Sequence, residues 1–372
     1  MENYREEKTR LELNKLILDI TTTIQAENPE LLNYLNEMPV TIPNEAHPEV
    51  DVNTLRAYYE SLVILLDRYE GTHSKKRNPE ERATIPVTEI RTMKEDKSSK
   101  QLVMELNNVV VSYQDVGEGS VPILFLHGFP FDKWMWKGQL DDLKSSNRVI
   151  AYDIRGFGKS TDEKSPLSID LFTEDLVLFM DKLNIEKAII CGLSMGGYIV
   201  LNAIKRFPER FAAIILCDTQ CIADTPEVKE KRYATIEQIK LNGAEAFNEK
   251  FVQSVFHPDS LVEMGELVKN LRSTVFSNSD QIIAAGLTAL AERGETCSIL
   301  EAIKVPTLIM CGKADQLTPV AQAEFMHKHI KGSRVEVIEK AGHVSNLEQP
   351  DEFNKHLRDF LKSVSLGIQL EK

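Results

Sequence analysis

The order of apolar and polar residues divides the chain into a helical front part and a body of alternating strands and helices. Between Leu13 and Ile24, apolar residues recur at helical spacing among charged ones, which predicts a helix with one apolar face. A second helical pattern starts near Asp51, a residue type that favours helix N-caps, and continues to Tyr69. Because prolines interrupt the pattern between these two segments, we predict an N-terminal helical hairpin over residues 1–72.

Residues 73–100 have the composition of a linker. They are charged and nearly free of aromatic side chains, as in the stretches SKKRNPEER and KEDKSSK. The preceding hairpin has too little apolar area to be stable alone. We therefore expect it to pack on the body, to associate with a second copy of the chain or to contact another protein.

From residue 101 the apolar pattern changes to that of strands. The segments LVMEL and VVVSYQDV flank Asn107 and Asn108, which tolerate positive φ, so this region predicts a β-hairpin. Short runs that are apolar on both faces then alternate with helical patterns, which is typical of a parallel sheet covered by helices. These runs are Val121–Leu126, Val149–Tyr152, Ala188–Cys191, Ala212–Cys217, Val305–Cys311 and Val335–Ile338. The sequence predicts an α/β domain over residues 101–372 with about eight, mostly parallel strands.

One connection in this domain is far longer than an ordinary link between consecutive strands. Residues 224–303 contain several helical patterns and no tryptophan. We interpret this segment as a helical cap inserted into the α/β domain.

Composition narrows the class of protein. The chain has 372 residues, a formal net charge of −13, 42% apolar and 27% charged residues, which excludes a disordered chain. The acidic balance argues against nucleic acid or an anionic membrane as a partner. The N-terminal residues lack the apolar segment of a signal peptide, and no run reaches the roughly 18–20 apolar residues that span a bilayer. We expect a soluble cytoplasmic protein.

The five cysteines do not form the pattern of a disulfide framework, since their number is odd and they are spread over a long chain. Cys191, Cys217 and Cys311 end apolar runs. This position is typical of reduced, buried thiols in a cytoplasmic protein.

A candidate nucleophile follows the run Ala188–Cys191. That run leads into Gly192-Leu-Ser194-Met-Gly196 and then into a helical pattern, so a G-x-S-x-G motif lies at a strand–turn–helix junction. The glycines relieve crowding at a sharp turn, which exposes the Ser194 hydroxyl. The turn also places the backbone N–H of Met195 at a helix N-terminus, where it can stabilise an oxyanion.

A serine hydroxyl needs a base, and the base needs a carboxylate to orient it. Asp315 follows one predicted strand and His343 follows the next, so both belong to the same edge of the sheet as Ser194. Asp218 also follows a strand, so it is the competing candidate for the acid or could orient nearby loops. We favour Asp315 because its strand directly precedes the one that leads to His343.

Further candidates surround these three residues. After Val121–Leu126 the sequence reads His127-Gly-Phe129-Pro, and the glycine allows a tight turn that makes the N–H of Phe129 a second oxyanion donor. Trp134 and Tyr198 are candidates for the substrate pocket, although aromatic residues more often pack in a core.

No metal or organic cofactor is predicted. His327 and His329 are two positions apart on a predicted helix, which points their rings in different directions, and no other group of ligands accompanies them. The run Gly158-Lys-Ser160 lacks the first glycine of a phosphate-binding P-loop.

Five segments carry a resemblance to a known family. From Val121 to about Leu361, the stretches LHGFP, YDIRGFGKS, GLSMGG, GKADQLTP and AGHVSNLEQP resemble the α/β-hydrolase superfamily. The SNLEQP tail and the run CDTQCIADTPE are similar to bacterial 3-oxoadipate enol-lactonase-like hydrolases. The resemblance implies the α/β-hydrolase fold, with Ser194, Asp315 and His343 as catalytic triad and Phe129 and Met195 as oxyanion hole. The N-terminal hairpin is not part of the superfamily pattern.

The residues and the resemblance together predict a serine hydrolase. We expect it to cleave a small carboxylic ester or lactone through an acyl-enzyme intermediate. Dehalogenases and epoxide hydrolases of this fold carry an aspartate where this chain has Ser194, so both are disfavoured. The alternatives are a C–C bond hydrolase, an acyltransferase or a perhydrolase with the same triad. A hydrolase-like signalling receptor that acts by binding another protein is a further alternative.

Overall fold

The computed structural model describes residues 101–161 and 166–370, with side chains to residue 364, and a few positions before them (17, 20–22, 24 and 62). Two units are distinguished, residues 1–94 and 95–372, and the sheet belongs to the second. Nearly all of the predicted hairpin (1–72) and linker (73–100) lies outside the described residues, so both stay predictions. Within the hairpin, the described side chains of Ile17, Ile20, Ile24 and Leu62 are buried and their backbones are helical.

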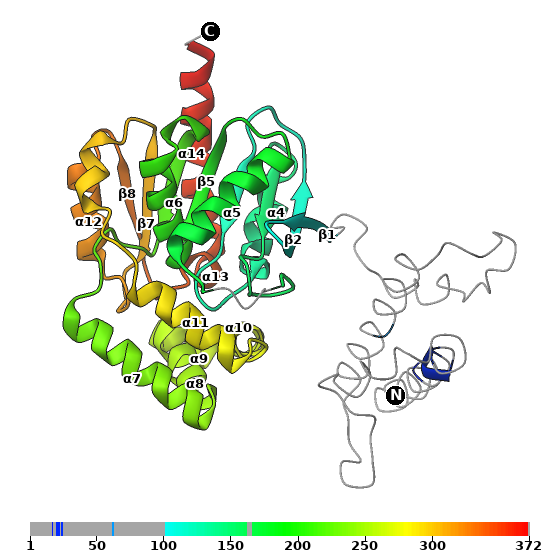
Figure 1. Cartoon of the computed structure of the whole chain (residues 1–372). Helices are drawn as coiled ribbons and strands as arrows, with labels where there is room; N and C mark the ends of the chain where they lie inside the picture. The colour runs from blue at the N-terminus through cyan, green and yellow to red at the C-terminus, as the bar shows by residue number, and fades with distance from the viewer. Residues whose placement is uncertain are drawn as a thin grey trace, which may run out of the picture. The chain divides into compact units, whose positions relative to one another are not determined.

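The second unit contains an eight-stranded sheet, which confirms the predicted fold class (Figure 1). The strand order is β1-β2-β4-β3-β5-β6-β7-β8, and only β2 runs against the other strands. The strands are β1 Leu102–Leu106, β2 Val109–Val116, β3 Ile123–Leu126, β4 Val149–Tyr152, β5 Ala188–Leu193, β6 Phe211–Cys217, β7 Thr307–Gly312 and β8 Arg334–Ile338.

The first two strands form the predicted hairpin. Asn107 and Asn108 have φ values of 47° and 63°, in the left-handed region that asparagine tolerates better than most residues. Leu106 pairs with Val109 across this two-residue turn. The turn therefore sets the register of the strand that begins the sheet.

Helices cover both faces of the sheet because side chains alternate along each strand. In β3, Leu124 and Leu126 join one apolar cluster, whereas Ile123 and Phe125 join the other. The first cluster includes side chains of α5 Ile169–Lys182, α6 Met195–Arg206 and α12 Val320–His329. The second includes side chains of α4 Lys137–Leu143 and α14 Pro350–Leu370. Three short helices, η4 Lys133–Trp136, η5 Pro208–Arg210 and α13 Ser345–Glu348, lie in the connections.

The predicted helical insertion between β6 and β7 is present. It consists of α7 Pro226–Asn242, α8 Glu245–Val255, α9 Pro258–Glu263, α10 Gly265–Phe276, α11 Asp280–Ala291 and η6 Cys297–Ala302. Figure 1 shows α7 to α11 together at one end of the sheet. Two hydrogen bonds join them to loops at the carboxyl ends of strands: Asn278 Nδ2 donates to the Pro130 carbonyl (2.8 Å), and the His343 N–H donates to the Val255 carbonyl (2.7 Å). These helices therefore cap the edge where the candidate site residues lie.

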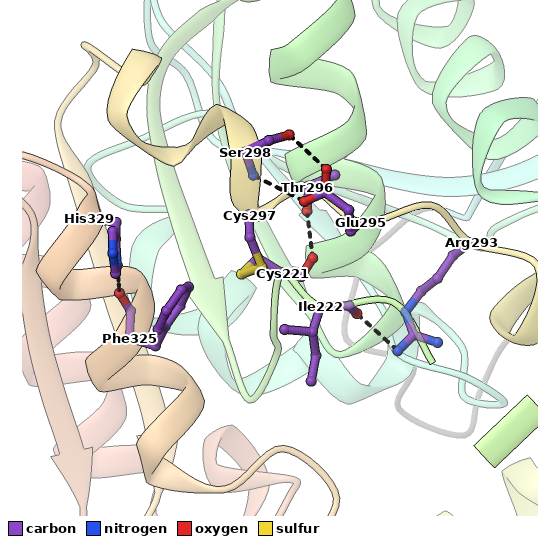
Figure 2. The surroundings of a disulfide bond; sticks show 9 residues. All are labelled: Cys221, Ile222, Arg293, Glu295, Thr296, Cys297, Ser298, Phe325 and His329. Carbon is purple, nitrogen blue, oxygen red and sulfur yellow. Dashed lines mark hydrogen bonds between the residues drawn. A yellow bond between two sulfur atoms is a disulfide. The ribbon is translucent and has the colours of Figure 1, made fainter. Parts of the chain in front are cut away.

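A disulfide closes the base of the cap. Cys221 lies four residues after β6 and is bonded to Cys297, the first residue of η6 (Figure 2). The α-helices α7 to α11 therefore lie between the two cysteines. The Thr296 N–H donates to the Cys221 carbonyl (2.8 Å) beside the bond. Sequence spacing did not indicate this pairing because the cysteines are 76 positions apart and meet only where the two ends of the cap come together. Cys191, Cys217 and Cys311 are free and buried, as predicted.

The disulfide predicts a specific thiol count and a loss of stability on reduction. Without a reductant, the denatured protein should show three reactive thiols, and reduction should raise this number to five. The Cys221→Ser/Cys297→Ser double variant should lose about 2–4 kcal/mol of unfolding free energy, because its unfolded chain is no longer restricted by a closed loop. Cys311→Ser, which leaves the bond intact, is the control for losing a sulfur atom. Five thiols before reduction would contradict the pairing.

Candidate active site

The turn that carries Ser194 is strained and crowded, as the glycine motif predicts. Ser194 has a φ of 54°, which a non-glycine residue adopts at an energetic cost. A Cβ atom on Gly192 would lie 2.3 Å from the Gly196 carbonyl oxygen, and one on Gly196 would lie 2.3 Å from the Leu126 carbonyl oxygen. Only glycine therefore allows β5, α6 and the end of β3 to approach so closely. Ser194 is partly exposed at this turn.

The loop after β3 lies beside the serine. A Cβ atom on Gly128 would be 3.2 Å from the Cβ of Ser194, so the backbone that continues into Phe129 runs close to the nucleophile. Met195 is the first residue of α6, and N–H groups in the first turn of a helix have no carbonyl partner within that helix. The two candidate oxyanion donors therefore belong to different segments: Met195 follows Ser194 in the chain, and Phe129 follows Gly128, which lies beside Ser194.

Asp315 and His343 form a buried hydrogen-bonded pair. His343 Nδ1 lies 2.8 Å from Asp315 Oδ2, and both side chains are almost fully buried. The backbone N–H groups of Leu317 and Thr318 donate to Asp315 Oδ1 (2.8 and 3.1 Å), and the Thr318 hydroxyl donates to Oδ2 (2.7 Å). A carboxylate with this many donors holds the imidazole in the tautomer that leaves Nε2 as the basic nitrogen.

The electrostatics of this pair favour an ionised aspartate. Burial by itself raises the pKa of Asp315, but His343 and the hydrogen bonds from Thr318 hold this pKa below its ordinary value. Burial lowers the pKa of His343, but Asp315, with further contributions from Asp218 and Glu348, leaves it above 6.5. The ionised carboxylate of Asp315 can therefore stabilise a positively charged ring of His343.

Two further carboxylates bind backbone at this edge: Asp218, the competing candidate for the acid, and Glu348, which the sequence analysis did not single out. Glu348, on α13, accepts hydrogen bonds from the N–H of Gly342 and from the N–H of His257 in the cap (both 2.7 Å). Asp218 accepts hydrogen bonds from the N–H of Gly312, three residues before Asp315, and from the hydroxyl of Ser345, two residues after His343. Glu348 lies within the SNLEQP run, but nothing in that run shows that its side chain reaches back to the loop of His343.

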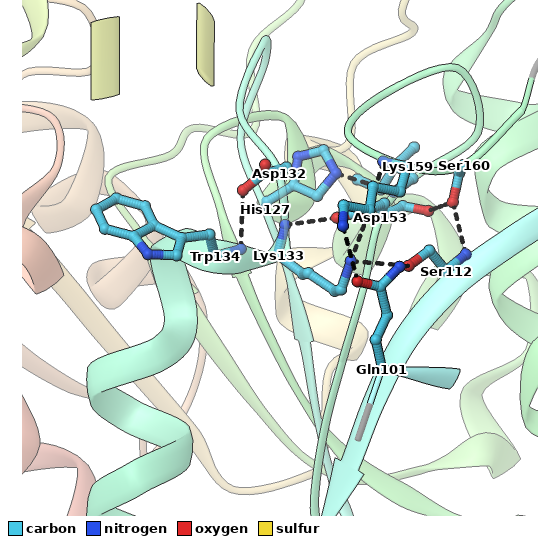
Figure 3. A network of polar contacts seen from close by, with 10 residues as sticks. Gln101, Ser112, His127, Asp132, Lys133, Trp134, Asp153, Lys159 and Ser160 are labelled. Carbon is cyan, nitrogen blue, oxygen red and sulfur yellow. Dashed lines mark hydrogen bonds and ion pairs between the residues drawn. The ribbon is translucent and has the colours of Figure 1, made fainter. Parts of the chain in front are cut away.

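A buried ion pair supports the loop after β3 (Figure 3). Lys133 Nζ lies 2.6 Å from Asp153 Oδ2, and the backbone N–H groups of Lys133 and Lys159 donate to the same carboxylate (2.8 and 2.9 Å). Lys133 also donates to Ser112 Oγ (2.9 Å). The pair joins the loop after β3 to the loop after β4.

His127 has the structural role that its position in this loop suggests. Its Nε2 accepts a hydrogen bond from the Ile154 N–H (2.9 Å), and its Nδ1 lies 2.8 Å from the Gly128 carbonyl, where the neutral ring donates. Figure 3 shows the ring next to the network of Asp153. Burial lowers the pKa of His127 to about 4, so the ring stays neutral near pH 7.

The two pocket candidates lie in different surroundings. Tyr198 lines a small pocket together with Gln220, Cys221 and Arg293, and the guanidinium carbon of Arg293 lies 4.5 Å from the centre of the Tyr198 ring. Trp134 is partly exposed in η4 and lines no part of that pocket. In contrast, Phe129 is buried against Phe247 and Phe251 of α8, so this residue joins the loop after β3 to the cap.

Comparison with known proteins agrees with this architecture. Residues 121–350 match the family described as alpha/beta hydrolase fold. The chain belongs to the α/β-hydrolase family. It is 30% identical over 256 residues to 3-oxoadipate enol-lactonase 2 of Acinetobacter baylyi, an alignment that covers 68% of this chain and 94% of the relative.

Solved structures give the same result. A thermophilic esterase from Thermogutta terrifontis superposes with a TM-score of 0.68 at 30% identity, covering 71% of this chain and 99% of the esterase. The enol-lactonase from Burkholderia xenovorans superposes with a TM-score of 0.66 at 28% identity, covering 70% of this chain and 100% of the enol-lactonase. The predicted resemblance to esterases and enol-lactonases is confirmed, and so is the assignment of the chain to the hydrolases.

The described part of the chain places limits on two other classes of site. Within it, no group of three or more His, Cys, Asp or Glu side chains is arranged to hold a metal ion. None of its helices is long and apolar enough to span a membrane.

The shifted pKa values of His127 and Asp132 predict two opposite effects of pH on the stability of the fold. His127 has a folded-state pKa below its ordinary value, so it stabilises the fold less as the pH falls from 6.5 to 4. Burial and the neighbouring Asp153 raise the pKa of Asp132 to about 6, so this carboxyl stabilises the fold more as the pH falls from 6 to 4. The two effects are of similar size and largely cancel in the wild type.

Single variants separate these effects in chemical denaturation at pH 7 and pH 4.5. Asp132→Asn keeps an acceptor for the Trp134 N–H and should lose about 2 kcal/mol relative to wild type on going to the lower pH. His127→Gln should gain about the same amount relative to wild type. Other titrating groups cancel in these differences. Equal pH dependence in all three proteins would contradict the two pKa shifts.

Proposed function

We propose that the protein is a serine hydrolase that cleaves a small carboxylic ester or lactone through an acyl-enzyme intermediate. The observation that carries this proposal is the buried pair of Asp315 and His343 on the sheet edge that also presents the strained turn of Ser194. The likeness to an enol-lactonase and to an esterase supports the choice of an ester or lactone carbonyl.

In the proposed mechanism, the Ser194 hydroxyl oxygen attacks the substrate carbonyl while His343 Nε2 accepts the hydroxyl proton. The N–H groups of Phe129 and Met195 hydrogen-bond to the carbonyl oxygen as it becomes negative. Asp315 stabilises the imidazolium, which then protonates the leaving alkoxide as the C–O bond breaks. With a lactone, this alkoxide remains attached to the acyl group. Water, deprotonated by His343, attacks the acyl-enzyme and releases the carboxylic acid and Ser194.

Substrate selection is assigned to the cap. Its α8 places Phe247 and Phe251 against Phe129, whose N–H is the proposed oxyanion donor. The pocket roles of Trp134 and Tyr198 stay predictions.

The cytoplasmic location also stays a prediction. The Cys221–Cys297 disulfide is a type of bond that is uncommon in a reducing cytoplasm. The thiol count of protein isolated under conditions that block exchange would show whether the bond forms in the cell.

Ser194→Ala tests the nucleophile. The variant should hydrolyse p-nitrophenyl acetate at least about 10⁴-fold more slowly than wild type, because no acyl-enzyme can form. Circular dichroism should be unchanged. Ser273→Ala, on the exposed surface of α10, is the matched control and should keep the wild-type rate. Wild-type hydrolysis by Ser194→Ala would refute the proposed nucleophile. Analysis of products from an ester, a lactone and a diketone separates ester cleavage from C–C cleavage.

The charge on Asp315 contributes to the pH dependence of kcat/KM by raising the pKa of His343. A base works only when it is unprotonated, so kcat/KM should fall with decreasing pH around a midpoint above 6.5, the ordinary pKa of histidine. The carboxyl groups that raise this midpoint are Asp315, Asp218 and Glu348. Asp315→Asn should lower the midpoint and reduce kcat by about 10³–10⁴-fold. A midpoint that does not move in Asp315→Asn would exclude Asp315 as the partner of the base.

A further inference from the structure

The residues at the end of β6 contact the nucleophile turn from two sides. The Ser194 N–H donates to the Cys217 carbonyl (2.9 Å), and the Thr219 hydroxyl donates to the Ser194 carbonyl (2.8 Å). Asp218 lies between these two residues. Any shift of its backbone is therefore transmitted to the strained turn of Ser194.

The side chain of Asp218 binds the two other loops of the site. Its Oδ1 accepts a hydrogen bond from the N–H of Gly312 (2.8 Å), three residues before Asp315. Its Oδ2 accepts one from the hydroxyl of Ser345 (2.6 Å), two residues after His343. One carboxylate thus joins the end of β7, from which the Asp315 loop starts, to the start of α13, at which the His343 loop ends.

An aspartate at position 218 lowers the stability of the fold, so packing alone does not explain its presence. The side chain has no exposed surface, and the residue has a φ of 44°, in the region that favours glycine. Burial and the nearby charge of Asp315 raise its pKa, and the thiols of Cys217 and Cys311 lie in the same electrostatic environment. The two hydrogen bonds to different loops account for a carboxylate at this position.

We propose that Asp218 is a positioning residue that holds the Asp315 and His343 loops at a fixed separation above the Ser194 turn. This inference rests on the proposed serine-hydrolase function and gives Asp218 a role other than that of the triad acid. Asp218 touches none of the reacting groups in this scheme. Displacement of a catalytic group by about 1 Å can reduce a rate by about 10²-fold, so a link of this kind acts on kcat.

A matched pair of substitutions at Asp218 separates positioning from charge. In Asp218→Asn, the amide oxygen can accept from the Gly312 N–H, and the amide nitrogen can donate to the Ser345 oxygen, so both links are kept. Asp218→Ala removes both. We expect kcat per active site, titrated with a fluorophosphonate, to stay within about threefold of wild type in the Asn variant and to fall about 10- to 100-fold in the Ala variant. KM should change less than about threefold in both.

Ser345→Ala breaks the same link from the side of His343 and provides a second variant if Asp218→Ala does not fold. It leaves Asp218 bonded to Gly312, so we expect a smaller loss of kcat, about 3- to 10-fold per titrated site. Ser345→Thr retains the hydroxyl and should recover most of this loss. A purely structural role would lower the melting temperature and leave kcat per titrated site unchanged.

Two results would overturn the proposal. One is wild-type kcat in Ser345→Ala and in folded Asp218→Ala. The other is a loss in Asp218→Asn as large as that in Asp315→Asn, which would make Asp218 the triad acid. Failure of the hydrolase function itself is recognised separately, because Ser194→Ala would then keep the activity of wild type.

Discussion

Close contact between backbones at the β5–α6 turn is the constraint on which the rest of the site depends. The end of β3, the turn at Ser194 and the first turn of α6 approach so closely that a single Cβ atom on Gly192 or Gly196 would overlap a carbonyl oxygen. This approach brings Gly128, and with it the loop after β3, next to the serine. The strain at Ser194 persists because β6 binds the turn through both its backbone and Thr219.

Buried carboxylates join the loops at this edge of the sheet. A carboxylate removed from water needs several donors, and the donors here come from different segments of the chain. Asp153 joins the loops after β3 and β4, Asp218 joins the end of β7 to the start of α13, and Glu348 joins the His343 loop to the cap. Each of these residues therefore stabilises a relation between two segments as well as its own position.

The cap is cross-linked at its base and contacts the loops that carry the candidate site residues. Its ends are tied by the Cys221–Cys297 bond and by the ion pair of Arg293 with Asp224 (2.8 Å). Its α8 contacts Phe129, in the loop after β3, through aromatic side chains. The proposed reaction takes place on the sheet edge, and in this proposal the choice of substrate depends on the cap residues beside it.

The sequence by itself determined the features that depend on local pattern and strand order. Apolar runs located the eight strands, Asn107 and Asn108 located the first turn, and the glycines around Ser194 located the strained turn. Since parallel strands end at one edge, the positions of Asp315 and His343 after consecutive strands were enough to predict that they meet.

Only the tertiary structure decided which distant residues become partners. The pairing of Cys221 with Cys297, the two links of Asp218 and the reach of Glu348 to the cap all join segments whose separation in the chain carries no periodic signal. The contact between the Tyr198 ring and the guanidinium of Arg293 at the base of the cap likewise joins distant segments. A local pattern reports which face of an element is buried, but the contacts between loops follow from how the whole sheet and its cap are packed.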